Sequence, residues 1–127
     1  MNEEDERESM KRQFVWLADI MNYLPMTTMI YDGCEADDVM AYISTQLLKE
    51  NEQAVVMSTD KDFLQLVDDT TIVWSPTKKK LYNKELVKEE YGIESKNLLL
   101  YRVLDGDKSD NIPGVHGCGI KTLVKRF

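Results

Sequence analysis

The chain has 127 residues, of which 43% are hydrophobic and 31% charged, so one compact domain is expected rather than two. This apolar fraction is too high for a disordered tail, and apolar runs are far shorter than the roughly 20 residues of a membrane helix. The acidic N-terminus is unlike a secretory signal. Two cysteines are too few for a disulfide framework or a four-ligand zinc site. We therefore expect a cytoplasmic protein with no membrane partner.

The charge balance is acidic, with a net charge of −7 from 16 basic and 23 acidic residues. Taken alone, this argues against nucleic acid as a partner, because phosphate backbones attract positive surfaces. Seven of the 23 acidic residues fall in three short clusters, however, and the other 16 balance the 16 basic residues. The excess of acid therefore favours a metal site over a surface that repels phosphate.

The first half of the chain alternates predicted helices and strands. Apolar residues at three- and four-residue spacing predict a helix over 3–24. The β-branched stretch 27–31 predicts a short buried strand, and a second helix is expected over 35–50. Residues 54–57 predict a second buried strand, followed by a short helix near 60–68.

The second half continues the alternation. The expected elements are a strand over 70–74, an edge strand over 79–82, helices over 84–91 and 95–104 with Asn83 and Ser95 as N-caps, and a last helix from about 116 to 127. Strands that alternate with helices predict an α/β fold with a parallel sheet.

Three clusters of carboxylates carry the candidate chemistry. They are Glu35, Asp37 and Asp38 after the first strand, Asp60 and Asp62 after the second, and Asp107 and Asp110 after the 95–104 helix. Ligands of open α/β sheets bind beyond the carboxyl ends of the strands. Carboxylates that converge there repel each other unless a cation lies between them. Such oxygen ligands suit Mg²⁺ or Mn²⁺, and two such ions commonly clamp a phosphodiester during in-line attack.

Each cluster also has a plainer explanation. Acidic side chains in the first turn of a helix complement its dipole and cap free N–H groups, and Asp107 and Asp110 suit an ordinary surface loop. A calcium-binding EF-hand that begins at Asp105 is excluded, because Asp110 and His116 stand where glycine and glutamate are required.

A glycine-rich stretch precedes the last predicted helix. Glycines let backbone N–H groups approach a phosphate, and a helix N-terminus adds a favourable dipole. This stretch predicts the hairpin of a helix–hairpin–helix, which grips duplex backbone irrespective of sequence; a simple helix-initiating turn is the plainer alternative. The candidate DNA contacts are Gly114, Gly117, Gly119, Lys121, Thr122 and Lys125.

Taken in order, three motifs resemble those of the flap endonuclease or 5′-nuclease family, which includes the N-terminal nuclease domain of bacterial DNA polymerase I and the phage 5′-exonucleases. The motifs are Glu35-Ala-Asp37-Asp38, Ser58-Thr-Asp60-Lys-Asp62, and Gly106-Asp107-Lys-Ser-Asp110-Asn-Ile-Pro-Gly114 continuing to Lys121-Thr122. The resemblance covers roughly residues 11–127. It implies a PIN-like, resolvase-like nuclease core that hydrolyses DNA or RNA phosphodiesters at 5′ flaps or RNA primers, in replication or repair, in a bacterial or phage-infected cell.

The resemblance also implies a catalytic role for each cluster. Glu35, Asp37 and Asp38 match ligands of the first of two Mg²⁺ or Mn²⁺ ions. The ligands nearer the second ion are matched by Asp60, Asp62, Asp107 and Asp110. Gly117 and Gly119 match the duplex-binding hairpin, which also holds K⁺ in some members.

The sequence departs from the family in two ways. Cys118 and Ile120 replace a more usual aliphatic and polar residue. Nothing matches the family's first strand and its metal-binding aspartates, and 3–24 resembles only the tail of its helical arch. We therefore expect a partial nuclease core over 1–104 and a truncated hairpin segment over 105–127, with an N-terminal half or a polymerase as partner. A non-catalytic duplex-binding module and a PIN-like ribonuclease are the alternatives, and the glycine-rich hairpin argues against the latter.

Overall fold

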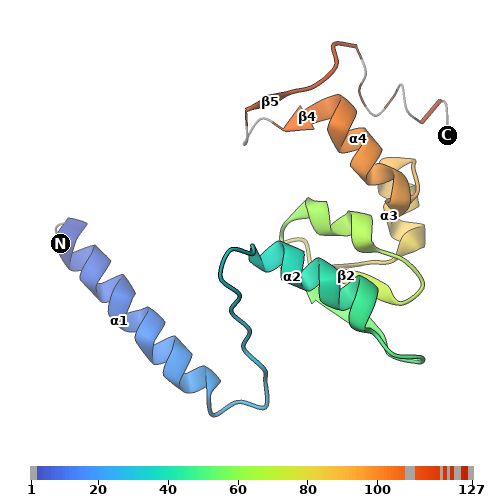
Figure 1. The fold of residues 1–127 in the computed structure, drawn as a ribbon. Helices are drawn as coiled ribbons and strands as arrows, with labels where there is room; N and C mark the ends of the chain where they lie inside the picture. The colour runs from blue at the N-terminus through green and yellow to red at the C-terminus, as the bar shows by residue number, and fades with distance from the viewer. Residues whose placement is uncertain (1–2, 108–110, 118, 120, 122–123, 126–127) are drawn as a thin grey trace. The chain divides into compact units, whose positions relative to one another are not determined.

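The computed structural model describes residues 3–107, 111–117, 119, 121 and 124–125 (Figure 1). The chain separates into two units, Met1–Gly33 and Cys34–Phe127. The expected division between residues 104 and 105 stays a prediction. In the described part of the chain, no helix has both the length and the apolar character needed to cross a bilayer.

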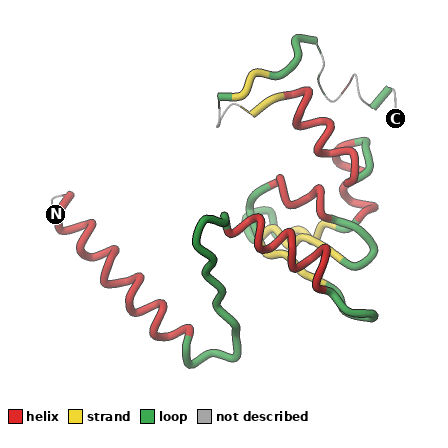
Figure 2. The backbone as a smooth tube through the Cα atoms, in the orientation of Figure 1, coloured by secondary structure: helices red, strands yellow, loops and turns green. Residues whose placement is uncertain are grey.

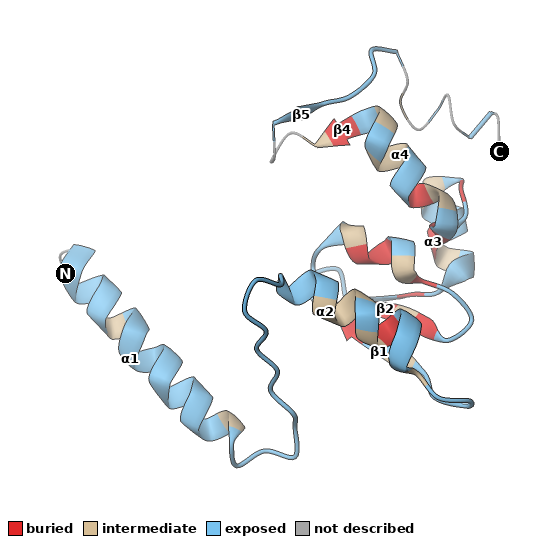
Figure 3. Cartoon of the chain, in the orientation of Figure 1, coloured by how far each residue is buried: buried red, intermediate tan, exposed pale blue. Residues whose placement is uncertain are grey.

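The first unit is built on one helix, α1 (Glu3–Met21), which confirms the helix predicted over 3–24. Its first turn is acidic, which complements the positive end of the helix dipole. Figure 3 shows α1 as almost wholly exposed. Phe14 and Leu17, on the apolar face that the spacing indicated, are exposed within this unit. The apolar periodicity therefore specifies the helix, but none of the described residues of α1 is buried.

The buried strand predicted over 27–31 is wrong. The segment belongs to no strand, and Ile30 is 86% exposed. Branched side chains favour an extended backbone, but a strand also needs a neighbour with which to exchange hydrogen bonds. Among the described residues, no segment pairs with this one.

The second unit contains a mixed three-stranded sheet in the order β1-β2-β3 (Figure 2). β1 (Ala54–Met57) runs parallel to β2 (Thr71–Ser75), as expected. β3 (Lys80–Tyr82) runs antiparallel to β2, so the prediction of a purely parallel sheet is wrong. The physical reason is the short turn between β2 and β3, which returns the chain directly and leaves no length for the crossover that a parallel strand needs.

The second unit also contains helices of several kinds. They are α2 (Ala36–Tyr42), the π-helical turn η1 (Ile43–Leu47), the 3₁₀ helices η2 (Lys61–Leu66) and η3 (Ser95–Asn97), α3 (Lys84–Tyr91) and α4 (Leu98–Asp105). The helix predicted over 35–50 is thus shorter and ends in the π turn. Asn83 is confirmed as an N-cap, because its side chain accepts a hydrogen bond from Leu86 N–H at 2.9 Å. Ser95 caps neither helix near it: Glu94 and Asn97 hold the N-cap positions.

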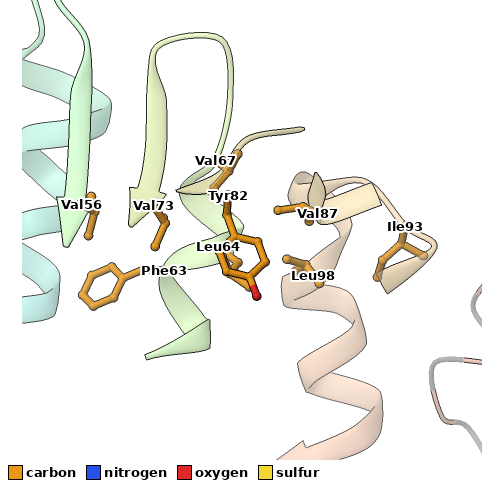
Figure 4. Close-up of a cluster of buried hydrophobic side chains, with 9 residues drawn as sticks. All are labelled: Val56, Phe63, Leu64, Val67, Val73, Tyr82, Val87, Ile93 and Leu98. Atoms are coloured by element: carbon orange, nitrogen blue, oxygen red, sulfur yellow. The ribbon is translucent and has the colours of Figure 1, made fainter. Parts of the chain in front are cut away.

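The hydrophobic core lies between the sheet, η2, α3 and the start of α4 (Figure 4). Its buried members are Val56, Phe63, Leu64, Val67, Val73, Tyr82, Val87, Ile93 and Leu98. The prediction of a buried strand over 54–57 is wrong for one face of β1, where Val55 and Met57 are exposed. The core anchors η2 and α4 to one body, and these two elements carry the candidate site.

A second, two-stranded sheet follows α4. β4 (Gly106–Asp107) pairs antiparallel with β5 (Ile112–Pro113). The helix–hairpin–helix and the final helix predicted over 116–127 stay predictions, because 108–110 and several later positions lie outside the described residues. The structure therefore describes part of the segment expected to hold duplex DNA.

Candidate functional site

Asp60 fixes the backbone that carries Asp62. Asp60 N–H donates to Ser58 Oγ at 3.1 Å, and Asp60 Oδ1 accepts from Asp62 N–H at 2.8 Å, as the N-cap of η2. This is the plainer role that acidic residues play at helix starts. It also supports the site, because the cap sets the direction in which the next carboxylate leaves the backbone.

Arg102 brings Asp62 and Asp107 together. Its Nη2 atom lies 2.8 Å from Asp62 Oδ1 and donates to Asp107 Oδ2 at 2.6 Å. The pKa of the guanidinium is raised, chiefly by the contact with Asp62 and further by the charge of Asp107. Two of the predicted carboxylates, from η2 and from β4, therefore converge on one cationic atom.

Backbone packing at two glycines sets the position of Asp107. A Cβ at Gly106, whose φ is +78°, would overlap the backbone of Gly114 and Ile112. A Cβ at Gly114 would overlap the backbone of Asp105. Only glycine permits this close approach of β4 to the following chain. Gly114, expected to contact DNA, thus has a packing role in the described structure.

Asp62 and Asp107 fit a divalent cation. Asp62 Oδ1 is enclosed, and the cationic Arg102 Nη2 at 2.8 Å compensates its charge in this structure; a buried carboxylate oxygen needs such a partner, whether a side chain or a metal ion. Carboxylate oxygens are the ligands that Mg²⁺ prefers, and Mg²⁺ sites commonly use only one or two of them besides water and substrate phosphate. Two convergent carboxylates are therefore compatible with one such ion.

The first cluster lies at the start of α2, which packs against η2. Glu35 holds the N-cap position without a side-chain cap bond, and Asp37 and Asp38 are exposed in the first turn. Within the described residues, no group of three or more His, Cys, Asp or Glu side chains could hold a metal ion. Asp110 lies outside the described residues. Convergence of all seven carboxylates stays a prediction.

The predicted DNA contacts lie on the segment that the structure describes only in part. Gly117 has a φ of +78°, with open space where a side chain would stand. Lys121 and Lys125 are exposed, as a phosphate contact requires. Gly119 is half-buried, and Thr122 lies outside the described residues. Their contact with DNA stays a prediction.

Arg102 is the residue that sequence reasoning missed. It lies in the last turn of α4, where a basic side chain is expected merely to complement the helix dipole. A usable signal was present nonetheless, because Arg102 precedes Asp107 by five positions and a single glycine connects the helix to that aspartate. Its contact with Asp62, forty positions earlier, depends on packing that no local pattern specifies.

A small hollow of about 100 Å³ adjoins this group. Its lining includes Asp62 and Arg102 together with Lys61 and the rings of Tyr91 and Tyr101. The side chain of Arg102 is 39% exposed. Arg102 therefore has space beside it into which it can move.

Comparison with protein families places these features among nucleases. Residues 2–92 match the model of the family described as 5′-3′ exonuclease, N-terminal resolvase-like domain. A 5′-3′ exonuclease of Buchnera aphidicola (subsp. Acyrthosiphon pisum) is 38% identical over 114 residues, which make up 87% of this chain and 40% of that protein. The thermostable DNA polymerase I of Thermus thermophilus is 36% identical over 118 residues, or 93% of this chain and 14% of the polymerase. The chain thus spans less than half the length of these relatives.

Solved structures give the same result. A structure of the T5 5′-exonuclease with bound zinc matches with a TM-score of 0.77 and 26% identity, over 100% of this chain and 49% of that one. A T5 protein co-crystallized with metal ions matches with a TM-score of 0.79 and 26% identity, again over 100% of this chain and 49% of that one. The α/β fold with its mixed sheet is therefore the resolvase-like fold of these proteins.

Proposed function

The chain belongs to the 5′-3′ exonuclease family, whose N-terminal resolvase-like domain it matches, and from this premise we propose that it takes part in metal-dependent cleavage of DNA or RNA near 5′ ends. The proposed substrate is a duplex with a 5′ flap or an RNA primer, in replication or repair, in the cytoplasm of a bacterial or phage-infected cell. Because the chain spans 40% of the Buchnera exonuclease, we further propose that it acts as part of a longer nuclease.

One observation carries this proposal: Asp62 and Asp107 converge on a single cationic nitrogen atom. Like charges approach each other in this way only when positive charge lies between them. The two residues come from elements far apart in sequence, and both belong to the motifs that resemble those of the 5′-nucleases. The geometry therefore supports a cation-binding role for this pair of acids.

In the proposed site, Asp62 and Asp107 hold one divalent cation, Mg²⁺ or Mn²⁺, with Asp60 and Asp110 close to it. The carboxylates of the 35–38 cluster hold a second. When bound, such ions polarise the scissile phosphate and stabilise the charge of the leaving oxygen. Asp60 serves this arrangement by orienting Asp62, because Asp60 Oδ1 accepts a hydrogen bond from the Asp62 N–H.

The proposed duplex contacts lie at the end of the chain. Exposed Lys121 and Lys125 supply positive charge to phosphates, and Thr122 adds a hydroxyl donor. Gly114, Gly117 and Gly119 let backbone N–H groups approach the duplex closely, and the same turn is the proposed K⁺ site. These contacts position the substrate without reading its sequence.

The test is cleavage of a labelled 5′-flap duplex in Mg²⁺ and in chelator. It uses the 127-residue chain and a longer version extended with the sequence that flanks it in its gene. We expect weak cleavage by the chain and strong cleavage by the longer version, because small misplacement of the reacting groups lowers the rate by about 100-fold. Asp62→Asn should abolish Mg²⁺-dependent cleavage, whereas Asp69→Asn, which changes an exposed acid paired with Lys84, should preserve it.

Other outcomes would identify the alternatives. Flap binding without cleavage by either version would indicate a non-catalytic duplex-binding module. Cleavage of single-stranded RNA with no preference for a flap would indicate a PIN-like ribonuclease. Full activity of both versions after Asp62→Asn would contradict the proposed metal site itself.

A further inference from the structure

Arg102 holds two carboxylates with one atom. Its Nη2 lies 2.8 Å from Asp62 Oδ1 and 2.6 Å from Asp107 Oδ2. The two carboxylate oxygens are therefore separated by no more than the sum of these two distances. A guanidinium has a second terminal nitrogen, and two-pronged pairing would use both. The use of one nitrogen for two carboxylates resembles the way in which a spherical ion gathers its ligands.

The position of this nitrogen is the one that a bridging metal ion would need. Mg²⁺ binds carboxylate oxygens at about 2.0–2.1 Å, so an ion shared by these two oxygens would lie in the space between them, which Nη2 fills in this structure. The guanidinium nitrogen and an ion would compete for this space, and their like charges would repel each other there. Binding of a divalent cation between these two oxygens would therefore displace Arg102 from its present position.

Arg102 is able to leave without disturbing the core. The side chain of Arg102 is 39% exposed. The helix that carries it is anchored to the core through Leu98. The hollow beside it is lined by Lys61 and Gln65 as well as by Asp62 and Arg102. A long, flexible side chain can turn toward solvent while its backbone stays in place. The backbone at Gly106, in contrast, has no such freedom.

We propose that Arg102 is a positioning residue that takes the place of a divalent cation between Asp62 and Asp107 in the metal-free protein and turns away when the cation binds. The inference rests on the proposed function only in taking Asp62 and Asp107 as metal ligands. Arg102 keeps the two carboxylates close in the absence of metal, so that the site is formed before metal arrives. It also competes with the metal and so lowers its apparent affinity.

An ordinary structural ion pair makes a different prediction. If Arg102 only joined α4 to η2, its removal would loosen Asp107 and weaken metal binding. A competing cation has the opposite effect on affinity, although both roles predict lower stability in chelator. The sign of the change in metal affinity therefore separates the two roles.

The first experiment measures Mn²⁺ binding to the 127-residue chain by calorimetry and melting temperature in chelator. Arg102→Gln should lower the metal-free melting temperature, yet bind Mn²⁺ about tenfold more tightly or better, equivalent to at least about 1.4 kcal/mol. Arg102→Lys, which keeps the charge, should return both values toward those of the wild type. Lys84→Gln, which removes a cation paired with Asp69 instead, should leave Mn²⁺ affinity unchanged.

The second experiment needs no variant. In a chain labelled with ¹⁵N-arginine, the chemical shift of the Arg102 side-chain N–H should change on titration with Mg²⁺. The midpoint of this change should equal the midpoint of metal binding. A signal that stays fixed while metal binds would overturn the proposal, as would equal or weaker Mn²⁺ binding by Arg102→Gln. Asp62→Asn separates this failure from that of the proposed function. If Asp62→Asn binds Mn²⁺ as the wild type does, or if the wild type binds none, the proposed metal site is wrong. The inference about Arg102 is then wrong as well.

Discussion

Tyr82 and Glu90 join the last strand of the sheet to helix α3. The Tyr82 hydroxyl donates to Glu90 Oε2 at 3.0 Å, and the same hydroxyl accepts a hydrogen bond from Lys78 Nζ at 2.9 Å. Tyr82 is 2% exposed, so its polar atom needs partners inside the protein. Lys78, from the turn before β3, and Glu90, from α3, supply them and close one edge of the core.

Removing this hydroxyl should destabilise the fold by about 1 kcal/mol, the usual net value of one intramolecular hydrogen bond. Tyr82→Phe keeps the buried ring and deletes only the bond to Glu90 and the acceptor for Lys78. Urea denaturation followed by circular dichroism measures the change. Tyr42→Phe is the matched control, because Tyr42 is 58% exposed. An equal loss in both variants would contradict the role of the Tyr82 hydroxyl.

Glu90 should make stability depend on pH in the acid range. Its pKa is lowered from 4.5, chiefly by the hydrogen bond from Lys80 and further by that from Tyr82. A carboxyl whose pKa is lowered by folding contributes stability above its unfolded pKa, and that contribution disappears as the pH falls through its folded pKa. Glu90→Gln should therefore be less stable than the wild type at pH 7 and lose less stability on acidification below pH 4.5.

Urea denaturation at pH 7 and pH 3 tests this expectation. Glu89→Gln, an exposed neighbour on the same helix, should follow the wild-type pH dependence. If Glu90→Gln and the wild type lose the same stability between the two pH values, the lowered pKa of Glu90 has no energetic consequence.

Gly106 should be required for metal binding and Gly117 should not, although both have a φ of +78°. Each alanine variant would have to adopt a positive φ, which costs about 1 kcal/mol or more. Only at Gly106 does the new Cβ also overlap neighbouring backbone, so β4 must shift and take Asp107 with it. Gly106→Ala should thus weaken Mn²⁺ binding about tenfold or more, a loss of about 1.4 kcal/mol, measured by calorimetry. Comparable weakening by Gly117→Ala would show that strain, rather than the position of Asp107, is responsible.

Lys121 should contribute to duplex affinity through phosphate alone. Each neutralised phosphate adds about 0.9 to the slope of log affinity against log salt, so Lys121→Ala should lower affinity equally for all sequences and reduce that slope by roughly one unit. Fluorescence anisotropy with duplexes of differing sequence, at several salt concentrations, provides the measurement. Lys49→Ala, at an exposed lysine outside the hairpin segment, should leave the slope unchanged. A loss limited to one duplex sequence would contradict a backbone contact.

Local signals in the sequence were sufficient for helices α1 and α3 and for the family. The side chain of Asn83 can accept a hydrogen bond from a free N–H of the helix that begins beside it. The start of α3 therefore depends only on residues within one turn of each other. The spacing of apolar residues likewise specifies α1, since a helix forms its hydrogen bonds within its own segment. The three acidic motifs identified the family, because their order and composition are features of the chain itself.

Tertiary packing decided what required a partner from elsewhere in the chain. Residues 27–31 have the composition of a strand, yet strand formation depends on a neighbouring segment. The contact of Arg102 with Asp62 depends on how the core places α4 beside η2. A helix has its hydrogen-bond partners within a few residues, whereas a strand and an ion pair between elements gain theirs only after the chain has folded. Because of this difference in range, the sequence alone determined the helices α1 and α3, and the tertiary structure decided the strand pairing and the contacts of Arg102.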